Sequence, residues 1–421
     1  MGIEHDSILL VLPVPFRGTP GPGLLFEKQA CNGLERWADH FGKVVVACPL
    51  EPGGVPGQGP STAATVEYLE IDSLPSRARI EPIPLPFAFR VGEFLKCYRE
   101  TRATLARAIG ESEHLSFAIG GLVGDWASVA ALEAIRQGRK YSVWTDRVEH
   151  RVIRTSHLDA SGLRRAYLRI KNNWIKSPLM KPLERHLIGR SALGLFHGRD
   201  CFDAYSPYCR EPHLVHDIHL KPGDRISPEQ LRAKAERIRA GGPIRLAYAG
   251  RMAEMKGPFD WVRAMAGLRD RGVAFHATWI GDGPLLAEAR AEVERLGLGD
   301  RVELPGFVGD RARLLQALRD SDLFVFCHKT PESPRCLIES LMSATPILGY
   351  DRPYPRDLLE DLAGRFLVPL DDVDALVDRI AAIDADRPGL ASAAERCDEL
   401  GSHYSDVAVF RHRSELIKEF A

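Results

Sequence analysis

Short apolar runs of strand length alternate with amphipathic stretches of helix length along most of the chain. The first series of runs is Ile8–Pro13, Lys43–Cys48, Leu115–Ile119, Tyr141–Thr145 and Leu193–His197, and the second is Ile244–Ala249, Phe275–Ile280, Arg301–Leu304, Leu323–Cys327 and Pro346–Gly349. The helical patterns include Leu24–His40, Trp126–Gln137, Pro258–Arg271, Pro284–Leu296, Arg311–Arg319 and Val373–Ile383. Continuous apolar strands that alternate with helices predict an α/β protein whose parallel sheets are covered on both faces. Two series of strands predict two such sheets.

The boundary between the two series lies where chain breakers cluster. Lys221-Pro222-Gly223-Asp224 precedes a polar helical pattern, and Gly241-Gly242-Pro243 precedes the next strand. A chain of 421 residues suits two domains of ordinary size. We therefore predict an N-terminal domain over residues 1–222 and a C-terminal domain over residues 243–402. The helical pattern in residues 403–421 is expected to return to the first domain.

Composition and charge narrow the class of protein. A net charge of −1 is not that of a polycation built to bind nucleic acid. The eight cysteines include no CxxC pair, so buried thiols in a reducing compartment are the simplest interpretation. The start of the chain lacks the basic and apolar parts of a signal peptide, and no apolar run is long enough to span a membrane. These features predict a cytoplasmic protein, which can still bind the inner surface of a membrane.

Two cations follow the first strand of the second series. The strand Ile244–Ala249 ends in Gly250-Arg251-Met252-Ala253-Glu254-Met255-Lys256-Gly257, and a helix opens at Pro258. Both Arg251 and Lys256 are thus expected at the carboxyl edge of a parallel sheet, where open α/β sheets bind ligands. Arginine offers a planar fork for phosphate oxygens and lysine a mobile charge. The pair indicates a diphosphate site, although two solvated loop cations would give the same pattern.

The later strands of this series end in further candidate loops. Gly281, in the turn Gly281-Asp282-Gly283-Pro284, would let the backbone come close to a ligand or to a neighbouring loop. Phe307 and Val308 follow the next strand, in a loop suited to hold a flat ring through backbone contacts.

The stretch Phe324–Glu339 carries two carboxylates around a helix start. A strand runs to Cys327, the following loop contains Glu332, and a helix begins at Arg335 or Cys336 and carries Glu339. The free N–H groups and the dipole of a helix start favour an anion, whereas carboxylates accept hydrogen bonds from the hydroxyls of a sugar or ribose. The spacing predicts one carboxylate for a sugar, one for a ribose, and phosphates between them. For Glu339, pairing with the helix start alone, at about 0.3–1 kcal/mol, is the simpler alternative.

Together these segments resemble the retaining GT-B glycosyltransferases of family 4, the group 1 glycosyltransferases. The resemblance is close over residues 244–350 and architectural elsewhere. Gly250, Arg251, Lys256 and Gly257 match the family's GR…KG loop. The family's paired-glutamate motif has seven residues between its acids and ends in E-A-x-A-x-G-x-P. Here Glu332 and Glu339 enclose six residues, and in the tail Glu339-Ser340-Leu341-Met342-Ser343-Ala344-Thr345-Pro346 an alanine replaces the glycine.

The resemblance implies a fold and a set of roles for the second domain. The GT-B fold consists of two Rossmann-like, doubly wound domains that face a central cleft, with the acceptor on the N-terminal domain. Arg251, Lys256 and the backbone amides near Cys336 and Leu337 would then hold the donor diphosphate. By the same resemblance, Glu339 would hold the ribose and Glu332 would contact the donor sugar.

In the first domain the resemblance implies two further positions. Gly23 ends a glycine-containing segment, Pro13–Gly23, that would close over the donor phosphates, although an ordinary βα loop is equally consistent. Asp146 follows the strand Tyr141–Thr145, where many relatives have a histidine, and His150 is nearby in the sequence. Asp146 would orient the donor sugar or the acceptor hydroxyl, or act as a general base if the enzyme inverts configuration. His197 is expected to be a polar cleft residue of unspecified role.

A basic segment occupies residues 163–190. It contains Arg164, Arg165, Arg169, Lys171, Lys176, Lys181, Arg185 and Arg190 against one acid, Glu184, with aromatic and aliphatic residues between them. This mixture suits an anionic membrane surface, beside a lipid-linked acceptor. A solvated helix face is the alternative, and nucleic acid is a poorer partner because no recognised binding module surrounds the segment.

The resulting hypothesis is a glycosyltransferase that moves a hexosyl unit from a nucleoside diphosphate sugar to an acceptor hydroxyl with retention, in the synthesis of capsule, exopolysaccharide or lipopolysaccharide. No metal or other cofactor is expected, because Arg251 and Lys256 would stabilise the leaving diphosphate and no Asp-x-Asp pair occurs in a suitable loop. Two alternatives are a UDP-sugar 2-epimerase-like enzyme and a non-catalytic homologue that binds sugar nucleotides.

Overall fold

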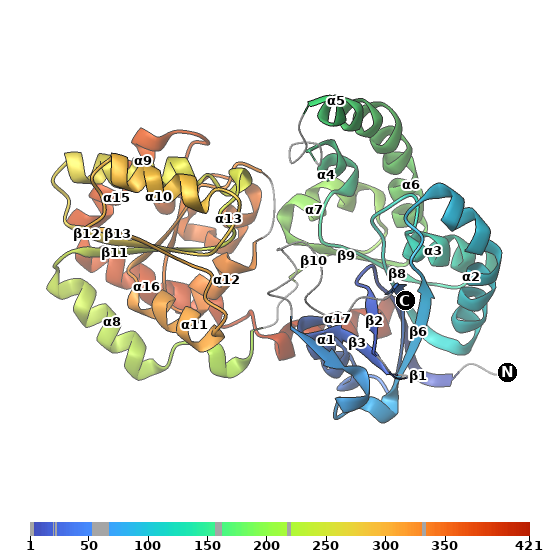
Figure 1. Cartoon of the computed structure of the whole chain (residues 1–421). Helices are drawn as coiled ribbons and strands as arrows, with labels where there is room; N and C mark the ends of the chain where they lie inside the picture. The colour runs from blue at the N-terminus through green and yellow to red at the C-terminus, as the bar shows by residue number, and fades with distance from the viewer. Residues whose placement is uncertain are drawn as a thin grey trace. The chain divides into compact units, whose positions relative to one another are not determined.

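The computed structural model describes residues 4–19, 21, 23–52, 67–155, 162–216, 220–330 and 334–421. The chain divides into two compact units (Figure 1). Unit 1 consists of Met1–His219 with Val407–Ala421, and unit 2 consists of Leu220–Asp406. Glu332 was predicted to contact the donor sugar and lies outside the described residues.

Unit 1 is built on a largely parallel sheet. The strand order is β10-β9-β8-β7-β1-β4-β2-β3-β5, and β6 also pairs with β4. The parallel strands are β1 (Glu4–Val11), β4 (Lys43–Glu51), β6 (Ile80–Pro86), β7 (Ser112–Ala118), β8 (Ser142–Thr145), β9 (Leu193–His197) and β10 (Pro212–Val215). The central strands are buried on both faces, which explains why they form continuous apolar runs.

A β-hairpin replaces part of the predicted first helix. The segment Leu24–Glu27 forms strand β3, which pairs antiparallel with β2 (Phe16–Gly18) and β5 (Tyr68–Glu70), and helix α1 begins only at Lys28 and ends at Ala38. The prediction of a helix from Leu24 was therefore wrong. The aromatic side chains of the hairpin explain the difference, because Phe26 is fully buried with its ring centroid 4.8 Å from that of Phe16.

Helices bury both faces of the unit 1 sheet. On one face the core includes residues of α2 (Val91–Glu111), α3 (Trp126–Gln137), α6 (Ser177–Arg190) and α7 (Gly198–Tyr205). On the other face it includes residues of α1 and of α17 (Asp406–Phe420). Phe410 of α17 packs edge-on against Trp37, with the ring centroids 5.3 Å apart. The last helix is thus a structural part of unit 1.

Unit 2 is built on a parallel sheet with the order β13-β12-β11-β14-β15-β16. Its strands are β11 (Ile244–Ala249), β12 (Phe275–Ile280), β13 (Val302–Gly306), β14 (Leu323–Phe326), β15 (Ile347–Tyr350) and β16 (Leu367–Val368). The chain therefore starts in the middle of the sheet, runs to one edge, and returns beside β11 to run to the other. This doubly wound order has its switch point between β11 and β14.

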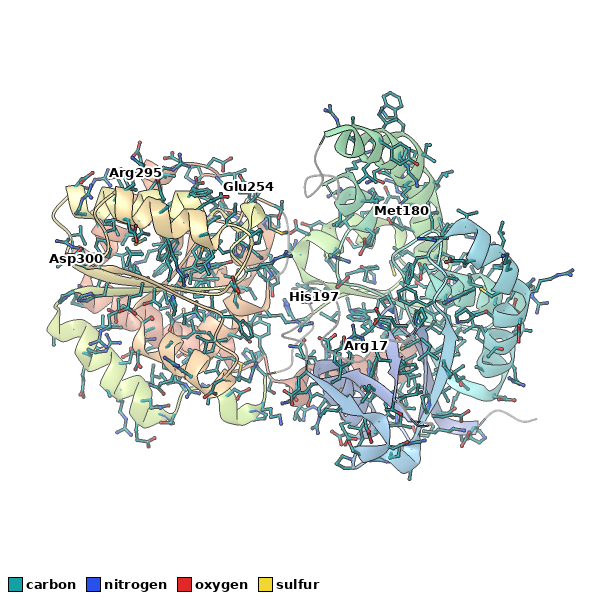
Figure 2. The ribbon with its side chains drawn as sticks, in the orientation of Figure 1. Arg17, Met180, His197, Glu254, Arg295 and Asp300 are labelled. Carbon is teal, nitrogen blue, oxygen red and sulfur yellow. The ribbon has the colours of Figure 1, made fainter. Side chains whose placement is uncertain are left out.

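Two layers of helices cover the unit 2 sheet (Figure 1). One contains α9 (Pro258–Asp270), α10 (Leu286–Arg295) and α15 (Val373–Ala385), and the other contains α8 (Pro228–Ala240), α11 (Arg311–Asp320), α12 (Arg335–Met342) and α16 (Arg387–Gly401). Glu254 follows β11 and Asp300 precedes β13, and the two lie at opposite ends of this sheet (Figure 2). Across the part of the chain that the structure describes, no helix combines the length and apolar character needed to cross a membrane.

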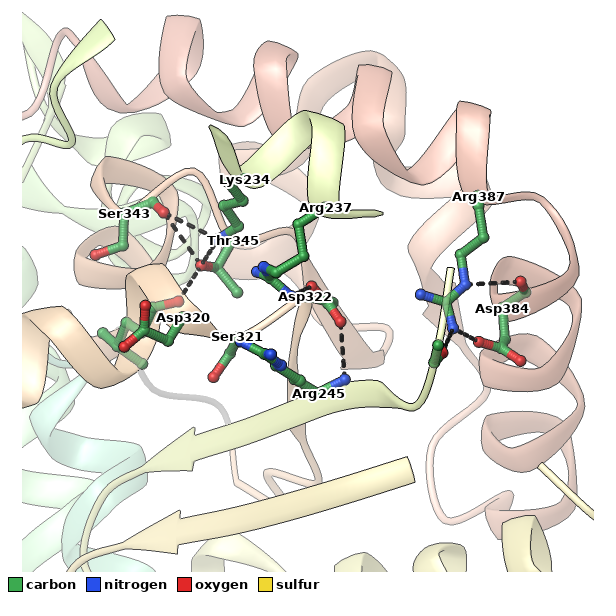
Figure 3. A network of polar contacts seen from close by, with 12 residues as sticks. Lys234, Arg237, Arg245, Asp320, Ser321, Asp322, Ser343, Thr345, Asp384 and Arg387 are labelled. Atoms are coloured by element: carbon green, nitrogen blue, oxygen red, sulfur yellow. Dashed lines mark hydrogen bonds and ion pairs between the residues drawn. The ribbon is translucent and has the colours of Figure 1, made fainter. Parts of the chain in front are cut away.

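A polar network supports the amino edge of this sheet (Figure 3). Asp322 accepts hydrogen bonds from Arg237 Nη1 at 2.6 Å and from the backbone N–H of Arg245 at 2.8 Å. The buried Lys234 Nζ donates to Ser343 O at 3.1 Å and to Thr345 Oγ1 at 2.6 Å. These contacts join α8 to the ends of neighbouring elements, at the edge opposite to the predicted ligand site.

Candidate functional site

The candidate site lies at the carboxyl edge of the unit 2 sheet, where the strand order changes direction. The loop after β11 contains Arg251 and Lys256, and the loop after β14 begins at Cys327. Doubly wound folds bind nucleotides outside the carboxyl ends of their strands at such a switch point, so this edge is the candidate ligand site. The sequence prediction placed both loops at this edge.

Backbone hydrogen bonds join the loops of this edge to one another. They run from Gly250 N to Ile280 O at 2.9 Å, from Met252 N to Asp282 O at 2.9 Å, from Gly281 N to Gly306 O at 2.9 Å, and from Lys329 N to Met255 O at 2.8 Å. Gly281 is required by this packing, because a Cβ there would lie 1.9 Å from Gly250 O. Gly257 has a φ of 63°, and a Cβ on it would lie 2.3 Å from Cys327 O. Gly257 of the GR…KG loop and Gly281 of the following turn thus allow loop-to-loop contact.

Arg251 and Lys256 differ in their surroundings. The Arg251 side chain is exposed and makes no hydrogen bond or ion pair with the residues that the structure describes. Lys256 is half-buried, in a short 3₁₀ turn (Glu254–Lys256), and its charge acts on His328 in the loop after β14. Lys256 therefore lies close to the loop after β14, whereas Arg251 extends into solvent.

His328 is a buried neutral residue that the sequence did not single out. Its Nε2 lies 2.7 Å from Tyr248 Oη. Burial and the nearby Lys256 charge hold the pKa of His328 well below its usual value, so the imidazole carries no charge at neutral pH. Lys256, and not His328, therefore supplies the positive charge at this position. A histidine directly after a buried strand was the only sequence signal for this position.

Lys329 is a cation of the loop after β14, and two carboxylates of unit 2 hold its ammonium group. Its ammonium group pairs with Asp260 of α9 and with Asp371 Oδ1, the latter at 2.5 Å. Tyr350 Oη donates to Asp260 Oδ2 at 2.7 Å. The contacts tie the β14 loop to the start of α9, one turn after Lys256. Lys329 therefore positions the loop, while Arg251 and Lys256 remain the better candidates for binding an anion.

Glu339 lies in the second turn of α12 with 16% of its side chain exposed. Its Oε1 lies 3.4 Å from Arg311 Nη1, and the same guanidinium lies 3.2 Å from Asp224 Oδ2. Burial raises the pKa of Glu339 above its usual value, although the Arg311 charge opposes the shift. Sequence reasoning missed Arg311, although it follows the N-cap Asp310 on the same edge of the sheet.

The remaining residues that were predicted to bind the donor differ in how available they are to a ligand. Helix α12 begins at Arg335, and the backbone N–H of Leu337 already donates to Pro334 O at 3.2 Å, so it is partly satisfied within its own turn. Cys336 is half-buried beside it. Phe307 follows β13 and is 55% exposed, and Val308 beside it is half-buried. An exposed aromatic ring at this edge is available for stacking.

In unit 1, Asp146 directly follows β8 and its side chain is 55% exposed. The Arg147 guanidinium lies 3.8 Å from Asp146 but 2.8 Å from Glu149, whose side chain is only 17% exposed. His150 is not available for ligand binding, because its Nδ1 lies 2.6 Å from the buried Glu184 carboxylate. Asp146 is therefore the accessible carboxylate after this strand.

The other two residues predicted to lie in the site of unit 1 are His197 and Gly23, and both make contacts within unit 1. His197 is buried at the end of β9, and its ring centroid lies 5.9 Å from that of His216. Gly23 lies in the turn of the β2–β3 hairpin, where its carbonyl accepts hydrogen bonds from the N–H and Oγ1 of Thr19, each at 3.1 Å. Gly23 thus precedes a strand rather than a helix. Among the side chains that the structure describes, no group of three or more His, Cys, Asp or Glu could hold a metal ion.

The two parallel-sheet α/β units have the fold of GT-B glycosyltransferases. The crystal structure of Anabaena HepE in complex with UDP matches with a TM-score of 0.64 and 15% identity, over 98% of this chain and 100% of that chain. WaaG, a glycosyltransferase involved in lipopolysaccharide biosynthesis, matches with a TM-score of 0.59 and 13% identity, over 97% of this chain and 99% of that one. At these identities the similarity concerns the fold, and the predicted GT-B fold is confirmed.

Sequence comparisons identify a family and relatives of higher identity. Residues 230–402 match the family model of glycosyl transferases group 1. A putative colanic acid biosynthesis glycosyltransferase, WcaL of Escherichia coli, is 28% identical over 202 residues, which are 46% of this chain and 48% of WcaL. The 2-deoxystreptamine N-acetyl-D-glucosaminyltransferase of Streptomyces fradiae is 32% identical over 202 residues, 47% of this chain and 46% of the relative. The chain spans about half the length of these relatives. The matches confirm the predicted resemblance to group 1 glycosyltransferases.

Proposed function

We propose that the chain is a glycosyltransferase that moves a hexosyl unit from a nucleoside diphosphate sugar to an acceptor hydroxyl with retention of configuration. The observation that carries the proposal is the position of Arg251 and Lys256. Both follow β11 at the switch point of a doubly wound sheet, inside the segment that matches the group 1 family. Two cations at this edge suit a diphosphate better than a neutral ligand.

The biological setting that we propose is the synthesis of a bacterial surface polysaccharide in the cytoplasm. Support comes from WcaL, which is named for colanic acid biosynthesis, and from AmsK of Erwinia amylovora, which is named for amylovoran biosynthesis. HepE, which has the same fold, has been crystallised with UDP and with UDP-glucose. The acceptor is then a saccharide or a lipid-linked saccharide.

In the proposed reaction the bond between the anomeric carbon and the diphosphate oxygen breaks, and the acceptor oxygen forms its bond on the same face of the sugar. The acceptor proton leaves with the diphosphate. Arg251 and Lys256 stabilise the charge that grows on the leaving group, so no metal ion is needed. Glu339 accepts hydrogen bonds from the ribose hydroxyls, Glu332 contacts the donor sugar, and Asp146 orients the acceptor hydroxyl or the donor sugar.

The first test is nucleotide release from a panel of UDP-, GDP- and ADP-sugars in the presence of membrane lipids. At least one donor should yield free nucleotide together with a glycosylated product, and an added chelator should leave the rate unchanged. Proton NMR of the product should show the donor's anomeric configuration. Binding without turnover for every donor would favour the non-catalytic homologue, and a rearranged sugar nucleotide would favour the epimerase.

The second test compares two arginines of the same strand region. Arg251 follows the carboxyl end of β11, whereas Arg245 is an exposed residue near its amino end. Arg251→Ala and Lys256→Ala should each weaken UDP binding by about tenfold or more, since each removes a charged contact to phosphate. Arg245→Ala should leave the affinity within about twofold. Equal effects of Arg245→Ala and Arg251→Ala in titration calorimetry would contradict the diphosphate assignment.

A further inference from the structure

A row of large apolar side chains is exposed on one continuous helical segment of unit 1. The segment comprises α5 (Gly162–Lys171), a π-helical turn (Asn172–Lys176) and α6 (Ser177–Arg190). We call the row the apolar stripe; its members are Tyr167, Ile170, Trp174, Ile175 and Leu179. Between 55% and 79% of each residue is exposed, with Trp174 the most exposed of the five. Burial against the sheet does not account for these residues.

The π-helical turn explains how the stripe comes to face outward. The opposite side of the segment is anchored in unit 1 by buried residues, which are Asn172, Ser177, Met180, Glu184, Leu187 and Ile188. Met180, labelled in Figure 2, is one of these anchors on α6. Asn172 and Ser177 are five residues apart, the repeat of a π-turn, whereas the later anchors recur at three or four. The wider turn places both Trp174 and Ile175 on the exposed side.

The stripe is surrounded by positive charge. The cations with described side chains are Arg169, Lys171, Lys176, Lys181, Arg185 and Arg190, and none forms an ion pair with another described residue. The sole acid between residues 166 and 190, Glu184, is buried and accepts a hydrogen bond from Tyr205 Oη at 2.8 Å. The exposed surface of residues 166–190 therefore carries no carboxylate.

We propose that the apolar stripe inserts into the headgroup region of an anionic lipid bilayer, with the surrounding lysines and arginines bound to lipid phosphates. An aromatic and aliphatic row flanked by cations matches such a surface, where the apolar side chains leave water and the cations meet negative charge. The charge distribution disfavours a second copy of this chain as the partner, because like charges would meet across the interface.

This inference goes beyond sugar transfer and bears on its acceptor. A transferase held at a bilayer through this segment would meet acceptors carried on a lipid. The binding measurement needs neither a donor nor an acceptor, so it stands or falls separately from the proposed activity.

Vesicle flotation tests the proposal with the full-length chain. Wild-type protein should float with phosphatidylcholine vesicles that contain about one third phosphatidylglycerol, and much less with phosphatidylcholine alone. Raising the salt from about 0.1 M to about 1 M should weaken the binding, because ions screen the charged contribution. Equal binding to neutral and anionic vesicles, or no binding to either, overturns the proposal.

Tryptophan fluorescence reports on the stripe directly. Among the six tryptophans, Trp174 is 79% exposed, while Trp37, Trp126, Trp261 and Trp279 are at most 5% exposed and Trp144 is half-buried. Anionic vesicles should shift the emission to shorter wavelength, and Trp174→Phe should remove most of that shift. A shift of wild-type size in Trp174→Phe means that another surface binds the vesicles, which contradicts the proposal.

Matched variants separate the stripe from exposed apolar residues in general. The triple variant Trp174→Ser/Ile175→Ser/Leu179→Ser should lower vesicle affinity by about tenfold or more. Leu95→Ser changes a 66% exposed leucine of α2 and should leave the affinity unchanged. Both variants should keep the wild-type melting temperature of unit 1, which shows that the unit carrying them is folded. If light scattering shows a wild-type dimer that the triple variant converts to monomers, without vesicle binding, the stripe is a self-association surface and the proposal is wrong.

Discussion

At the scale of single residues, the surroundings of Glu339 change the pH at which this side chain loses its charge. Burial raises its pKa, so Glu339 takes up a proton at a higher pH than an exposed glutamate does. In the proposed role of Glu339, protonation removes one of the carboxylate oxygens that would accept hydrogen bonds from the ribose hydroxyls. UDP affinity should therefore fall as the pH drops towards the raised pKa. Titration calorimetry between about pH 5 and 8 measures this step.

The matched variants are Glu339→Gln and Glu303→Gln. The first should weaken UDP binding by about tenfold at neutral pH and remove the acidic step, since an amide does not titrate there. The second changes an exposed glutamate of β13 and should retain the step. An acidic step that survives Glu339→Gln would assign it to another group.

The backbone of Ala344 is strained, and the sequence already indicates this because alanine stands at the position of the family motif's glycine. It has a φ of 51°. Its N–H donates to Leu341 O and the Thr345 N–H donates to Ser340 O, both at 2.9 Å, which completes a Schellman motif after α12. This position favours glycine, the residue that the family has there, whereas alanine pays about 1–2 kcal/mol for the left-handed conformation.

The predicted consequence is that Ala344→Gly is nearly neutral. The buried methyl group that is lost and the strain that is relieved should cancel to within about 0.5 kcal/mol in the free energy of unfolding. Ala130 is equally buried in the middle of α3, and Ala130→Gly should cost about 2 kcal/mol because nothing is relieved there. Equal costs in urea denaturation would exclude strain at Ala344.

At the scale of secondary-structure elements, the buried Lys234 joins helix α8 to the rest of unit 2. Burial lowers the pKa of Lys234 to about 7, below the usual value of 10.5. Between these two values the unfolded chain binds the additional proton, so the free energy of unfolding should rise with pH by at most about 1.4 kcal/mol per pH unit. Below about pH 7 both states are protonated and the penalty is constant.

Replacement of Lys234 should remove this rise of the free energy of unfolding with pH. Lys234→Met should flatten the stability of unit 2 between about pH 7 and 10 and stabilise it at the lower end. Arg232→Met on the exposed side of the same helix should keep the wild-type slope. Urea unfolding at several pH values measures both, and a slope that persists in Lys234→Met would contradict the assignment.

The element scale also shows what the sequence could and could not predict. Most parallel strands and their helices were predicted to within a few residues, because a strand buried on both faces produces an unbroken apolar run. The β2–β3 hairpin was missed since Leu24–Glu27 is apolar at its start and continues directly into α1. Its strand conformation depends on pairing with β2 and β5, a contact that no local pattern encodes.

For the candidate site, the edge was predictable but the pairings within it were not. A strand end followed by Arg251 and Lys256 is a local pattern, whereas the Arg311–Glu339 pair joins residues 28 positions apart. Lys329 was not interpreted from the sequence, and only the structure shows that Asp260 and Asp371 hold it. Local sequence thus identified the cations, and tertiary contacts decided which of them are available to a ligand.

At the scale of the whole molecule, the chain's last helix belongs to the unit that its first strands build. Phe410 is buried in the unit 1 core beside Trp37, so Phe410→Ala should destabilise unit 1 by about 3–5 kcal/mol. If unit 2 binds UDP as proposed, UDP should raise the melting temperature of that unit, because it would bind only the folded form. In calorimetry, Phe410→Ala should lower the temperature of the unit 1 unfolding transition, which is the one that UDP does not shift.

The control is Val407→Ala on the same helix, where 38% of the residue is exposed, and it should change neither transition by more than about 0.5 kcal/mol. A Phe410→Ala variant in which only the UDP-sensitive transition falls would show that the helix stabilises unit 2 instead.

The hydrogen bonds between the loops at the carboxyl edge of the unit 2 sheet allow the side chains of this edge to change during evolution. They use main-chain atoms, which every residue except proline supplies, so exchange of an exposed side chain such as Arg251 or Phe307 removes none of them. Only positions like Gly257 and Gly281, where backbones touch, are closed to exchange. Selection can therefore alter what this edge recognises one side chain at a time, while the scaffold that presents those side chains is inherited unchanged.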